Sequence, residues 1–302
     1  MVIGTFGHEL IEMPINIASK QCNVSQANIL VHGHFAPVAS YTNEVWGMAI
    51  YPNRERYATC SDDAKLKIWD TNSRKCIKTV DLNLDKTGKP IPMDPKWKDL
   101  TPAGQGRSVD VSPKGDFIAV GMRDGSLRVF QTSSWKMVHM QKCGNEWIED
   151  LKFSPDGTKL AVGGHDNKLY IFSMPDCKPL VKKFGKSSSF ITHLDWSIDS
   201  QSIRTNDGSY ELLYYSAADG SQIKSGATVF RDEPWATNSC VLGWGVQGIW
   251  QSGMDFTDIN HADRSHRPIV DDMQLIATAD DHGKVNLFRY PSMIEKSTPL
   301  QG

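Results

Sequence analysis

The sequence has little of what catalysis, secretion or membrane insertion usually requires. No apolar run is long enough for a transmembrane helix, and the first residues lack a basic region followed by an apolar core. The six cysteines include no CxxC pair, a pattern that suits buried thiols in a reducing compartment. A net charge of −2 provides no general attraction to nucleic acid or to an anionic membrane. We therefore expect a cytosolic or cytoskeletal protein with neither nucleic acid nor membrane as its partner.

Motifs for enzymatic chemistry are also missing from the sequence. There is no GxSxG string, and Gly185-Lys-Ser187 lacks the glycine that a phosphate-binding loop requires at Leu180. His32 and His34 have the spacing of a chelating pair, but no third ligand is placed by the sequence. We expect neither an enzyme nor a metal or cofactor site.

A repeated unit is the strongest positive feature of the chain. The stretch from Arg54 to Asp70 returns, with the same pattern, from Gly115 to Phe130 and from Gly157 to Phe172. An aromatic residue recurs at the same slot of five copies: Trp69, Phe130, Phe172, Tyr215 and Phe288. Repeats of about 40 residues are typical of the blades of a WD-repeat propeller. The two longer intervals, 69–130 and 215–288, contain insertions.

Each copy has the pattern of short strands joined by tight turns. In the third copy, the alternating run from Ile148 to Phe153 leads into Ser154-Pro-Asp-Gly157, whose proline and glycine favour a chain reversal. No segment shows a convincing helical period. The sequence therefore predicts an all-β fold.

The repeats predict one domain, a WD-repeat β-propeller segment over residues 1–302. Its expected parts are a partial amino-terminal blade at 1–36, blades at 37–80, 107–145, 146–186, 187–228 and 257–302, and loop insertions at 82–106 and 230–256. An incomplete ring would leave strand edges and blade faces uncovered. We therefore expect the five blades and the partial blade to belong to a seven-bladed ring in a longer protein.

Several strings resemble known families. Asp62 to Asp70, with Gly33-His34 ahead of it, resembles the WD-repeat signature. The string from Trp235 to Trp250 is more specific and resembles a hallmark of the echinoderm microtubule-associated-protein-like (EMAP-like) family. Further strings similar to this family lie at 207–214, 257–260 and 280–291.

The chain also departs from the family pattern. The family tends to have proline near Gly245 and Gln251 and an aromatic residue near His282, so we interpret the chain as a divergent member. The resemblance covers residues 33–291 and implies most of the second of two joined propellers. It implies binding to tubulin or microtubules and to other microtubule-associated proteins, in the cytoplasm, the cytoskeleton and the ciliary or flagellar axoneme.

Some motif residues are expected to hold the blades together. Asp63, Asp124 and Asp166 share one slot of the repeat, where WD blades typically pair an aspartate with a histidine. His34 is the expected partner of Asp63, and Trp69 is the aromatic residue of the same blade. The fourth and fifth copies have Ser209 and His282 in this slot, so packing should matter more in those blades.

The insertions are the expected binding surface, because long loops on a rigid scaffold often carry binding residues. Together with 35–43, they connect an outer strand to the next inner strand, so we expect them on one face. The candidate partner-binding residues are Lys86, Lys89, Lys96, Trp97, Lys98, Trp235, Trp244 and Trp250. The alternative is that the tryptophans pack the loops onto the blades. For Trp244 and Trp250 the neighbouring glycines favour packing.

Two functions are compatible with these features. The first is a non-catalytic, microtubule-associated scaffold that binds through the loop face, as the family resemblance implies. The alternative is a general WD-repeat adaptor, such as a ubiquitin-ligase substrate receptor, which only the platform-like fold favours.

Overall fold

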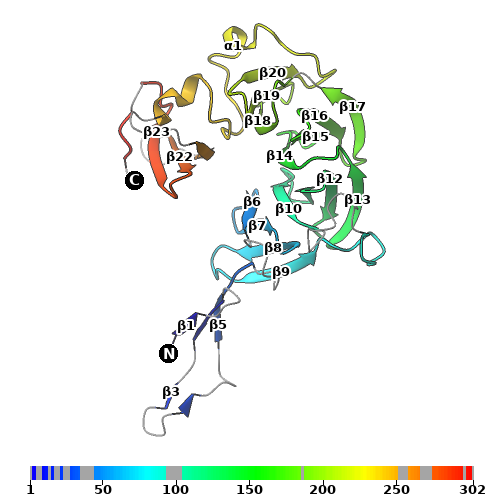
Figure 1. Ribbon diagram of the computed structural model, residues 1–302, viewed down its shortest axis with the longest axis vertical. Coiled ribbons are helices and arrows are strands. Elements are labelled where there is room, and N and C mark those ends of the chain that lie inside the picture. Colours follow the sequence, from blue (N-terminus) through cyan, green and yellow to red (C-terminus); the bar gives the residue numbers. More distant parts are fainter. Residues whose placement is uncertain are drawn as a thin grey trace. The chain divides into compact units, whose positions relative to one another are not determined.

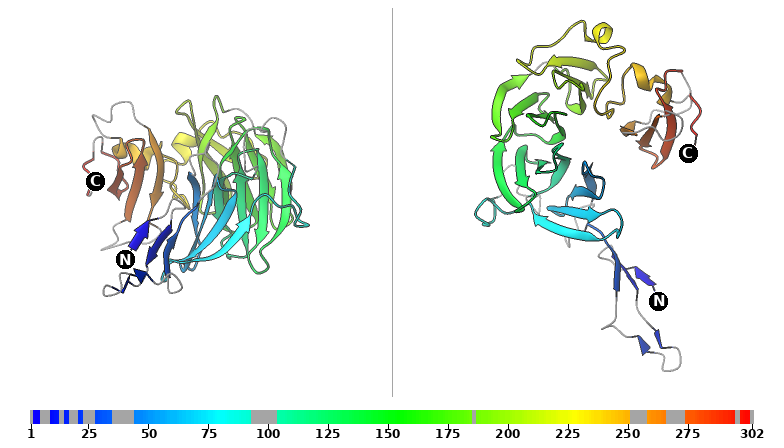
Figure 2. Two further views of the ribbon diagram at one scale, coloured as in Figure 1. Left: turned by 60° about the horizontal axis from the view of Figure 1, so that its bottom comes forward. Right: turned by 180° about the vertical axis from the view of Figure 1, so that it is seen from behind.

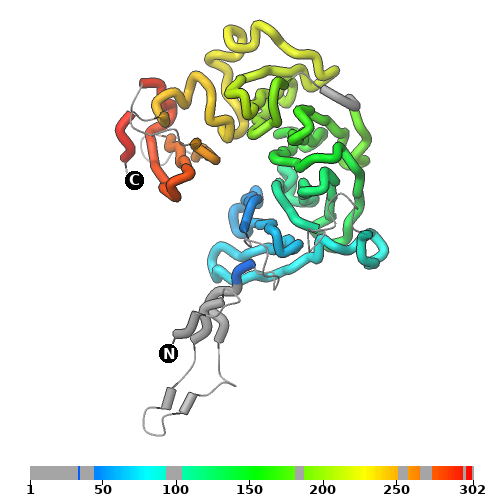
Figure 3. Tube along the Cα trace, in the orientation of Figure 1, coloured from blue at the N-terminus to red at the C-terminus, as the bar shows by residue number. Residues whose placement is uncertain are grey.

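The protein divides into two compact units, Met1–Leu151 and Lys152–Gly302, and each is described by itself (Figure 1). The structure, a computed structural model, describes the backbone of strand residues 2–4, 9–12, 15–16, 21–22, 28–32 and 181–184. It describes backbone and side chains for residues 33–34, 44–92, 104–180, 187–250, 258–265, 274–294 and 297–300 (Figure 3).

Unit 1 consists of antiparallel sheets. Its strands are β1 (Val2–Gly4), β2 (Glu9–Glu12), β3 (Ile15–Asn16), β4 (Gln21–Cys22), β5 (Asn28–His32), β6 (Val45–Ile50), β7 (Arg56–Ser61), β8 (Lys65–Asp70), β9 (Cys76–Asp81), β10 (Gly106–Val111), β11 (Phe117–Met122), β12 (Ser126–Gln131) and β13 (Lys136–Lys142). Two four-stranded sheets have the orders β6-β7-β8-β9 and β10-β11-β12-β13. The sheet β1-β2-β5 and the pair β3-β4 precede them.

Unit 2 continues the same pattern, and the division of the chain into units falls within β14 (Ile148–Phe153). Its elements are β15 (Lys159–Gly164), β16 (Leu169–Ser173), β17 (Lys178–Phe184), β18 (Ile191–Trp196), β19 (Ser202–Asp207), β20 (Leu212–Ser216), the helix α1 (Gly226–Val229), a 3-10 helix (Trp244–Ile249), β21 (Ile259–Arg264), β22 (Gln274–Asp280) and β23 (Val285–Tyr290). The sheet orders are β14-β15-β16-β17, β18-β19-β20 and β21-β22-β23.

The prediction of an all-β propeller fold with five blades is confirmed by the five sheets from β6 to β23. Their strands run along the chain as antiparallel meanders, which Figure 2 shows from two further directions. The sheet β1-β2-β5 lies within the predicted partial blade at 1–36, and the seven-bladed ring stays a prediction. The two described helices are both shorter than two full α-helical turns, which explains why no helical period is visible in the sequence. Neither is long and apolar enough to span a membrane.

A serine fixes the reversal between the first two strands of three blades. The hydroxyls of Ser112, Ser154 and Ser197 each accept the backbone N–H of the residue five positions later, at 2.9 Å. In the blade that begins with β14, Gly157 supplies the left-handed backbone (φ 72°) that closes this turn. The predicted turn at 154–157 is therefore a hydrogen-bonded element and not only a glycine-containing bend.

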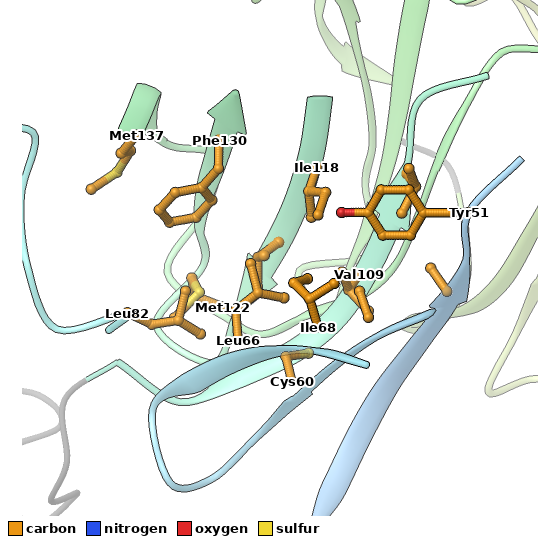
Figure 4. Packing of buried hydrophobic residues seen from close by; sticks show 14 residues of the cluster. Tyr51, Cys60, Leu66, Ile68, Leu82, Val109, Ile118, Met122, Phe130 and Met137 are labelled. Atoms are coloured by element: carbon orange, nitrogen blue, oxygen red, sulfur yellow. The ribbon is translucent and has the colours of Figure 1, made fainter. Parts of the chain in front are cut away.

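The core of unit 1 lies between its two four-stranded blades (Figure 4). Leu66 and Ile68 of β8 and Ile118 of β11 are completely buried there. Small residues allow the sheets to approach: a Cβ added at Gly106 of β10 would meet Cβ of Cys60 of β7 at 2.7 Å. Every second residue of β11, namely Ile118, Val120 and Met122, belongs to this core, and the residues between them are buried as well, so β11 is covered on both faces.

Replacing Ile118 by alanine should remove part of this core. Because Ile118 is completely buried, we expect the free energy of unfolding to fall by about 2–5 kcal/mol. Chemical denaturation followed by circular dichroism measures this change. Ile77→Ala is the matched control, because Ile77 is 48% exposed and its loss should cost less than about 0.5 kcal/mol. Equal effects of the two changes would contradict the assignment of the core.

Candidate partner-binding surface

Three side chains of the blade β6–β9 and His34, which lies between β5 and β6, form one buried hydrogen-bonded chain. Nε1 of Trp69 donates to Oγ1 of Thr59 at 2.7 Å, and the same oxygen lies 2.7 Å from Nε2 of His34. Nδ1 of His34 lies 2.9 Å from Oδ2 of Asp63. A neutral His34 with its proton on Nδ1 satisfies every member, because the Thr59 hydroxyl then donates to Nε2. Burial alone would raise the pKa of Asp63, but the hydrogen bonds from His34, the Ser61 hydroxyl and the Lys65 N–H hold it below its usual value.

The corresponding aspartates of the next two blades have different partners. Asp124 accepts hydrogen bonds from the backbone N–H and the hydroxyl of Ser126, at 2.8 and 2.6 Å. Asp166 accepts one from the Tyr170 hydroxyl at 2.5 Å and lies 3.1 Å from Nζ of Lys168. The aspartates at this position of the repeat therefore make different hydrogen bonds in each blade, and only Asp63 pairs with a histidine among the described contacts.

In the last two blades an aspartate two residues earlier in the chain takes over this role. These residues, Asp207 and Asp280, were not predicted from the sequence. Oδ1 of Asp207 accepts the backbone N–H groups of Ser209 and Glu211, each at 3.0 Å. Oδ1 of Asp280 accepts those of His282 and Lys284, at 3.0 and 2.9 Å. The signal was present in the sequence, because both aspartates end a strand two residues before the slot. These blades have a hydrogen-bonded turn and do not depend on packing alone.

The carboxylate of Asp195 anchors the second insertion. It is completely buried in β18. Its oxygens accept hydrogen bonds from the Thr237 hydroxyl at 2.6 Å, the Ser239 N–H at 2.9 Å and the Cys240 N–H at 3.0 Å. Nε and Nη2 of Arg204, on β19, both donate to Oδ2, the oxygen that also accepts the Cys240 N–H, at 3.0 and 2.9 Å. The insertion is therefore attached to the blade β18–β20 by a buried charge.

Trp235 belongs to the same anchor. It is 3% exposed, and the Arg204 guanidinium lies 4.6 Å from the centre of its ring. Its backbone oxygen accepts Nη2 of Arg264, from β21, at 2.8 Å. Trp235 thus packs the insertion onto the blade and is not presented to solvent.

A second attachment holds the far end of the insertion. Backbone hydrogen bonds join Gly248 N–H to the Ser292 oxygen at 2.7 Å and Ser292 N–H to the Gly245 oxygen at 2.8 Å. A Cβ on Gly245 would lie 3.0 Å from the Tyr290 hydroxyl, so the glycine does permit the close approach that the sequence suggests. Trp250 is half-buried, and its Nε1 donates to the Val241 oxygen at 2.9 Å.

Trp244 differs from the expectation that it packs. Its side chain is 44% exposed, and the Arg231 guanidinium lies 4.4 Å from the centre of its ring. The glycines beside Trp244 bring the backbone, not the indole, against the blade. The preference for packing is therefore wrong for Trp244, which stands exposed between two attached segments.

The first insertion begins as a short hairpin. Leu82 is completely buried, and Oδ1 of Asp85 accepts the N–H groups of Thr87 and Lys89 at 2.7 and 2.9 Å. Lys86 and Lys89 are exposed at its tip. Lys96, Trp97, Lys98 and the loop 35–43 lie outside the described residues. That the insertions share one face stays a prediction.

The described residues contain no group of three His, Cys, Asp or Glu side chains arranged to hold a metal ion. Both ring nitrogens of His34 already lie against Asp63 and Thr59. Burial raises the pKa of the Cys60 thiol to about 12 and that of Cys240 well above its usual value. Neither of these thiols is an activated nucleophile.

Comparison with known proteins gives consistent matches. The family model described as the echinoderm microtubule-associated protein second beta-propeller matches residues 45–301. Echinoderm microtubule-associated protein-like 2 of Homo sapiens is 39% identical over 267 residues, which cover 87% of this chain and 36% of the relative. Echinoderm microtubule-associated protein-like 3 of Mus musculus is 37% identical over 265 residues, covering 87% and 27%. The chain thus spans about a third of the length of these relatives, and the resemblance seen in the sequence is confirmed.

Replacing Asp195 by asparagine should loosen the insertion. Because the change leaves the Arg204 charge buried without its partner, we expect the free energy of unfolding to fall by about 3–5 kcal/mol. Amide hydrogen exchange over residues 235–243 should accelerate, since Ser239 and Cys240 donate to this carboxylate. Asp219→Asn, at an exposed turn, should leave exchange in this segment unchanged. Unchanged exchange in Asp195→Asn would show that the carboxylate is not the anchor.

The same anchor should respond to pH in one direction. Burial alone would raise the pKa of Asp195, but the charge of Arg204 and the hydrogen bonds to the carboxylate hold it far below its usual value. Because the pKa of Asp195 is lower in the folded protein, its ionised carboxylate stabilises the fold fully above the pKa of an unfolded aspartate, which is about 4. This stabilisation is lost only as the pH falls below that value. Exchange of the Ser239 and Cys240 amides, corrected for intrinsic rates, should therefore show constant protection from about pH 5 to pH 8. A loss of protection between about pH 7 and pH 5 would contradict the ionised anchor.

Proposed function

Because this chain belongs to the echinoderm microtubule-associated protein-like family, we propose that it is a non-catalytic, microtubule-associated scaffold. It binds tubulin or microtubule partner proteins through the loop face of its propeller blades. Its expected location is the cytoplasm and cytoskeleton, including the ciliary or flagellar axoneme. The relatives carry microtubule association in their names, and this chain corresponds to about a third of their length.

The observation that supports this proposal best is the exposed Trp244 in an anchored insertion. Its neighbours on the chain are attached on one side through Asp195 and on the other through Ser292. The loop around the indole is therefore already ordered before a partner arrives. Exposed tryptophan and arginine side chains on ordered loops are the residues that most often dominate the energy of protein interfaces.

Cationic side chains are exposed on both insertions. In the second insertion the Arg231 side chain is 55% exposed beside Trp244, with an oxygen of the exposed Asp232 3.9 Å from its Nε, and in the first insertion Lys86 and Lys89 are exposed. Cationic side chains of this kind increase the rate of association with an acidic partner surface. They suit a partner whose surface carries an excess of carboxylates.

The 302-residue chain should sediment with purified microtubules or bind tubulin dimers in solution. We expect Trp244→Ala to weaken this binding about tenfold or more, because it removes an exposed aromatic anchor from an ordered loop. Sedimentation over a range of microtubule concentrations measures the change.

Leu180→Ala is the control variant, since Leu180 is 46% exposed on strand β17 and lies outside the insertions. It should bind as the unchanged chain does. The proposal fails if the unchanged chain binds neither microtubules nor tubulin at low and physiological salt. Equal weakening by both variants would move the binding surface away from the insertion.

A further inference from the structure

A group of aromatic and cationic side chains in unit 1 has no role in the anchors described above. We call it the tryptophan–arginine cluster: Trp46, Gln105, Arg107, Arg123 and Trp147. Trp46 and Arg107 lie at the starts of β6 and β10, and Arg123 directly follows β11. Since Gly106 pairs with Met122 across β10 and β11, Arg107 and Arg123 lie at the same end of one sheet.

The rings hold the two guanidinium groups in place. The Arg107 guanidinium carbon lies 4.0 Å from the centre of the Trp46 ring and 4.7 Å from that of Trp147. The Arg123 guanidinium carbon also lies 4.7 Å from the centre of the Trp147 ring. Cation–π contacts at such distances are favourable. Two positive charges therefore share one indole.

The cluster contains more buried hydrogen-bond donors than acceptors. Nε2 of Gln105, Nε and Nη1 of Arg107, and Nε of Arg123 are buried and make no hydrogen bond with the described part of the chain. Gln105 is 1% exposed and Arg107 is 3% exposed. Buried donors of folded proteins nearly always have an acceptor, and leaving one unpaired is unfavourable. The missing component is thus a group that offers acceptor oxygens.

The two arginines of the cluster do not each have a carboxylate partner. Nη1 of Arg107 lies 3.0 Å from Oδ1 of Asp62, although the pair lacks the geometry of a hydrogen bond. Burial, and then the charge of Arg123, lower the pKa of Arg107 to about 10 against the opposing effect of Asp62. The described contacts of Arg123 are a 3.0 Å hydrogen bond to neutral Gln105 and the Trp147 ring. One guanidinium therefore has no carboxylate of its own among the described residues.

We infer that the tryptophan–arginine cluster binds a carboxylate side chain from an acidic segment of a partner protein. The carboxylate accepts hydrogen bonds from Nε of Arg107, Nε of Arg123 and Nε2 of Gln105, whereas Nη1 of Arg107 remains beside Asp62. The inference rests on the proposed function only for the identity of that partner. Trp46 is 41% exposed and Val45 is 54% exposed beside it, so the apolar stem of a glutamate has a surface to cover.

The surroundings favour a single negative charge over a phosphate group. The carboxylates of Asp62, Glu44 and Glu149 all act on the charge of Arg107. A doubly charged phosphate would meet more repulsion from them than a carboxylate does. Planar carboxylates also match the fork of donors that a guanidinium presents.

A titration of the full chain with a short capped peptide of alternating glycine and glutamate tests the site. Binding should be saturable in calorimetry and should change tryptophan fluorescence, because the carboxylate lies beside Trp46 and Trp147. Arg123→Gln should weaken binding about tenfold or more, the loss expected for a charge-assisted hydrogen bond. Arg123 is only partly buried, so this variant should fold. Trp46→Ala should weaken binding without any change of charge.

Arg289→Gln is the control, because it removes the same charge from an exposed arginine of β23 that belongs neither to the cluster nor to the insertions. It should leave peptide binding unchanged. The glutamine counterpart of the peptide should not bind, and inorganic phosphate should bind more weakly than the glutamate peptide. The inference is overturned if the glutamate peptide does not bind, if phosphate binds more tightly, or if Arg123→Gln and Arg289→Gln weaken binding equally.

Failure of this site and failure of the proposed function are distinguishable. A chain that binds the peptide through Arg123 but binds no microtubules or tubulin keeps the carboxylate site and loses the proposed function. A chain that sediments with microtubules but ignores the peptide keeps the proposed function and loses the site. Weakened sedimentation of Arg123→Gln would support both together.

Discussion

The structure of unit 2 depends on one buried carboxylate, that of Asp195. A charge removed from water is strongly unfavourable unless hydrogen bonds and an opposite charge replace its hydration. Here Arg204 supplies the opposite charge, and Thr237, Ser239 and Cys240 of the insertion supply donors. The blade cannot satisfy this group without the insertion. The second insertion, although it interrupts the repeat, is therefore a required part of the blade β18–β20.

This requirement explains how residues 230–250, the described part of the insertion, are held. The segment leaves β20, is attached at Asp195, and is attached again where Gly245 and Gly248 meet Ser292. Loop entropy opposes the ordering of such a segment, and each attachment shortens the part that remains free. Trp244 follows the first attachment directly and is exposed, so its indole is held in place without being buried. An exposed aromatic residue held in this way needs little further ordering when it contacts a partner.

The sequence predicted the features that depend on neighbours along the chain. The repeat located the strands, and Gly245 and Gly248 indicated a close backbone approach because a Cβ at either position would crowd its neighbours. The contact of His34 with Asp63 was also anticipated, since it belongs to a recurrent motif. Asp195 could not be foreseen, because Ser239 and Cys240 reach it only after the chain has folded back over the blade. The exposure of Trp244 had no sequence signal either, because a glycine-rich string has the same composition whichever side of the backbone faces the blade.

Two arginine–tryptophan pairs in this chain have the same residue types but different hydrogen bonding. We use that difference to distinguish a pair that stabilises the fold from one that binds a partner. Arg204 stacks on Trp235 and directs its nitrogens to Asp195 and Asn238, so no buried nitrogen of its guanidinium is left without a partner. Arg107 stacks on Trp46 at a similar distance, yet two of its buried nitrogens make no hydrogen bond with the described residues. The first arrangement is complete within the chain and therefore stabilises it. The second pair holds hydrogen-bond donors away from water, where a hydrogen bond to an added acceptor is strongest. An acceptor for these donors must therefore come from a group outside the described residues.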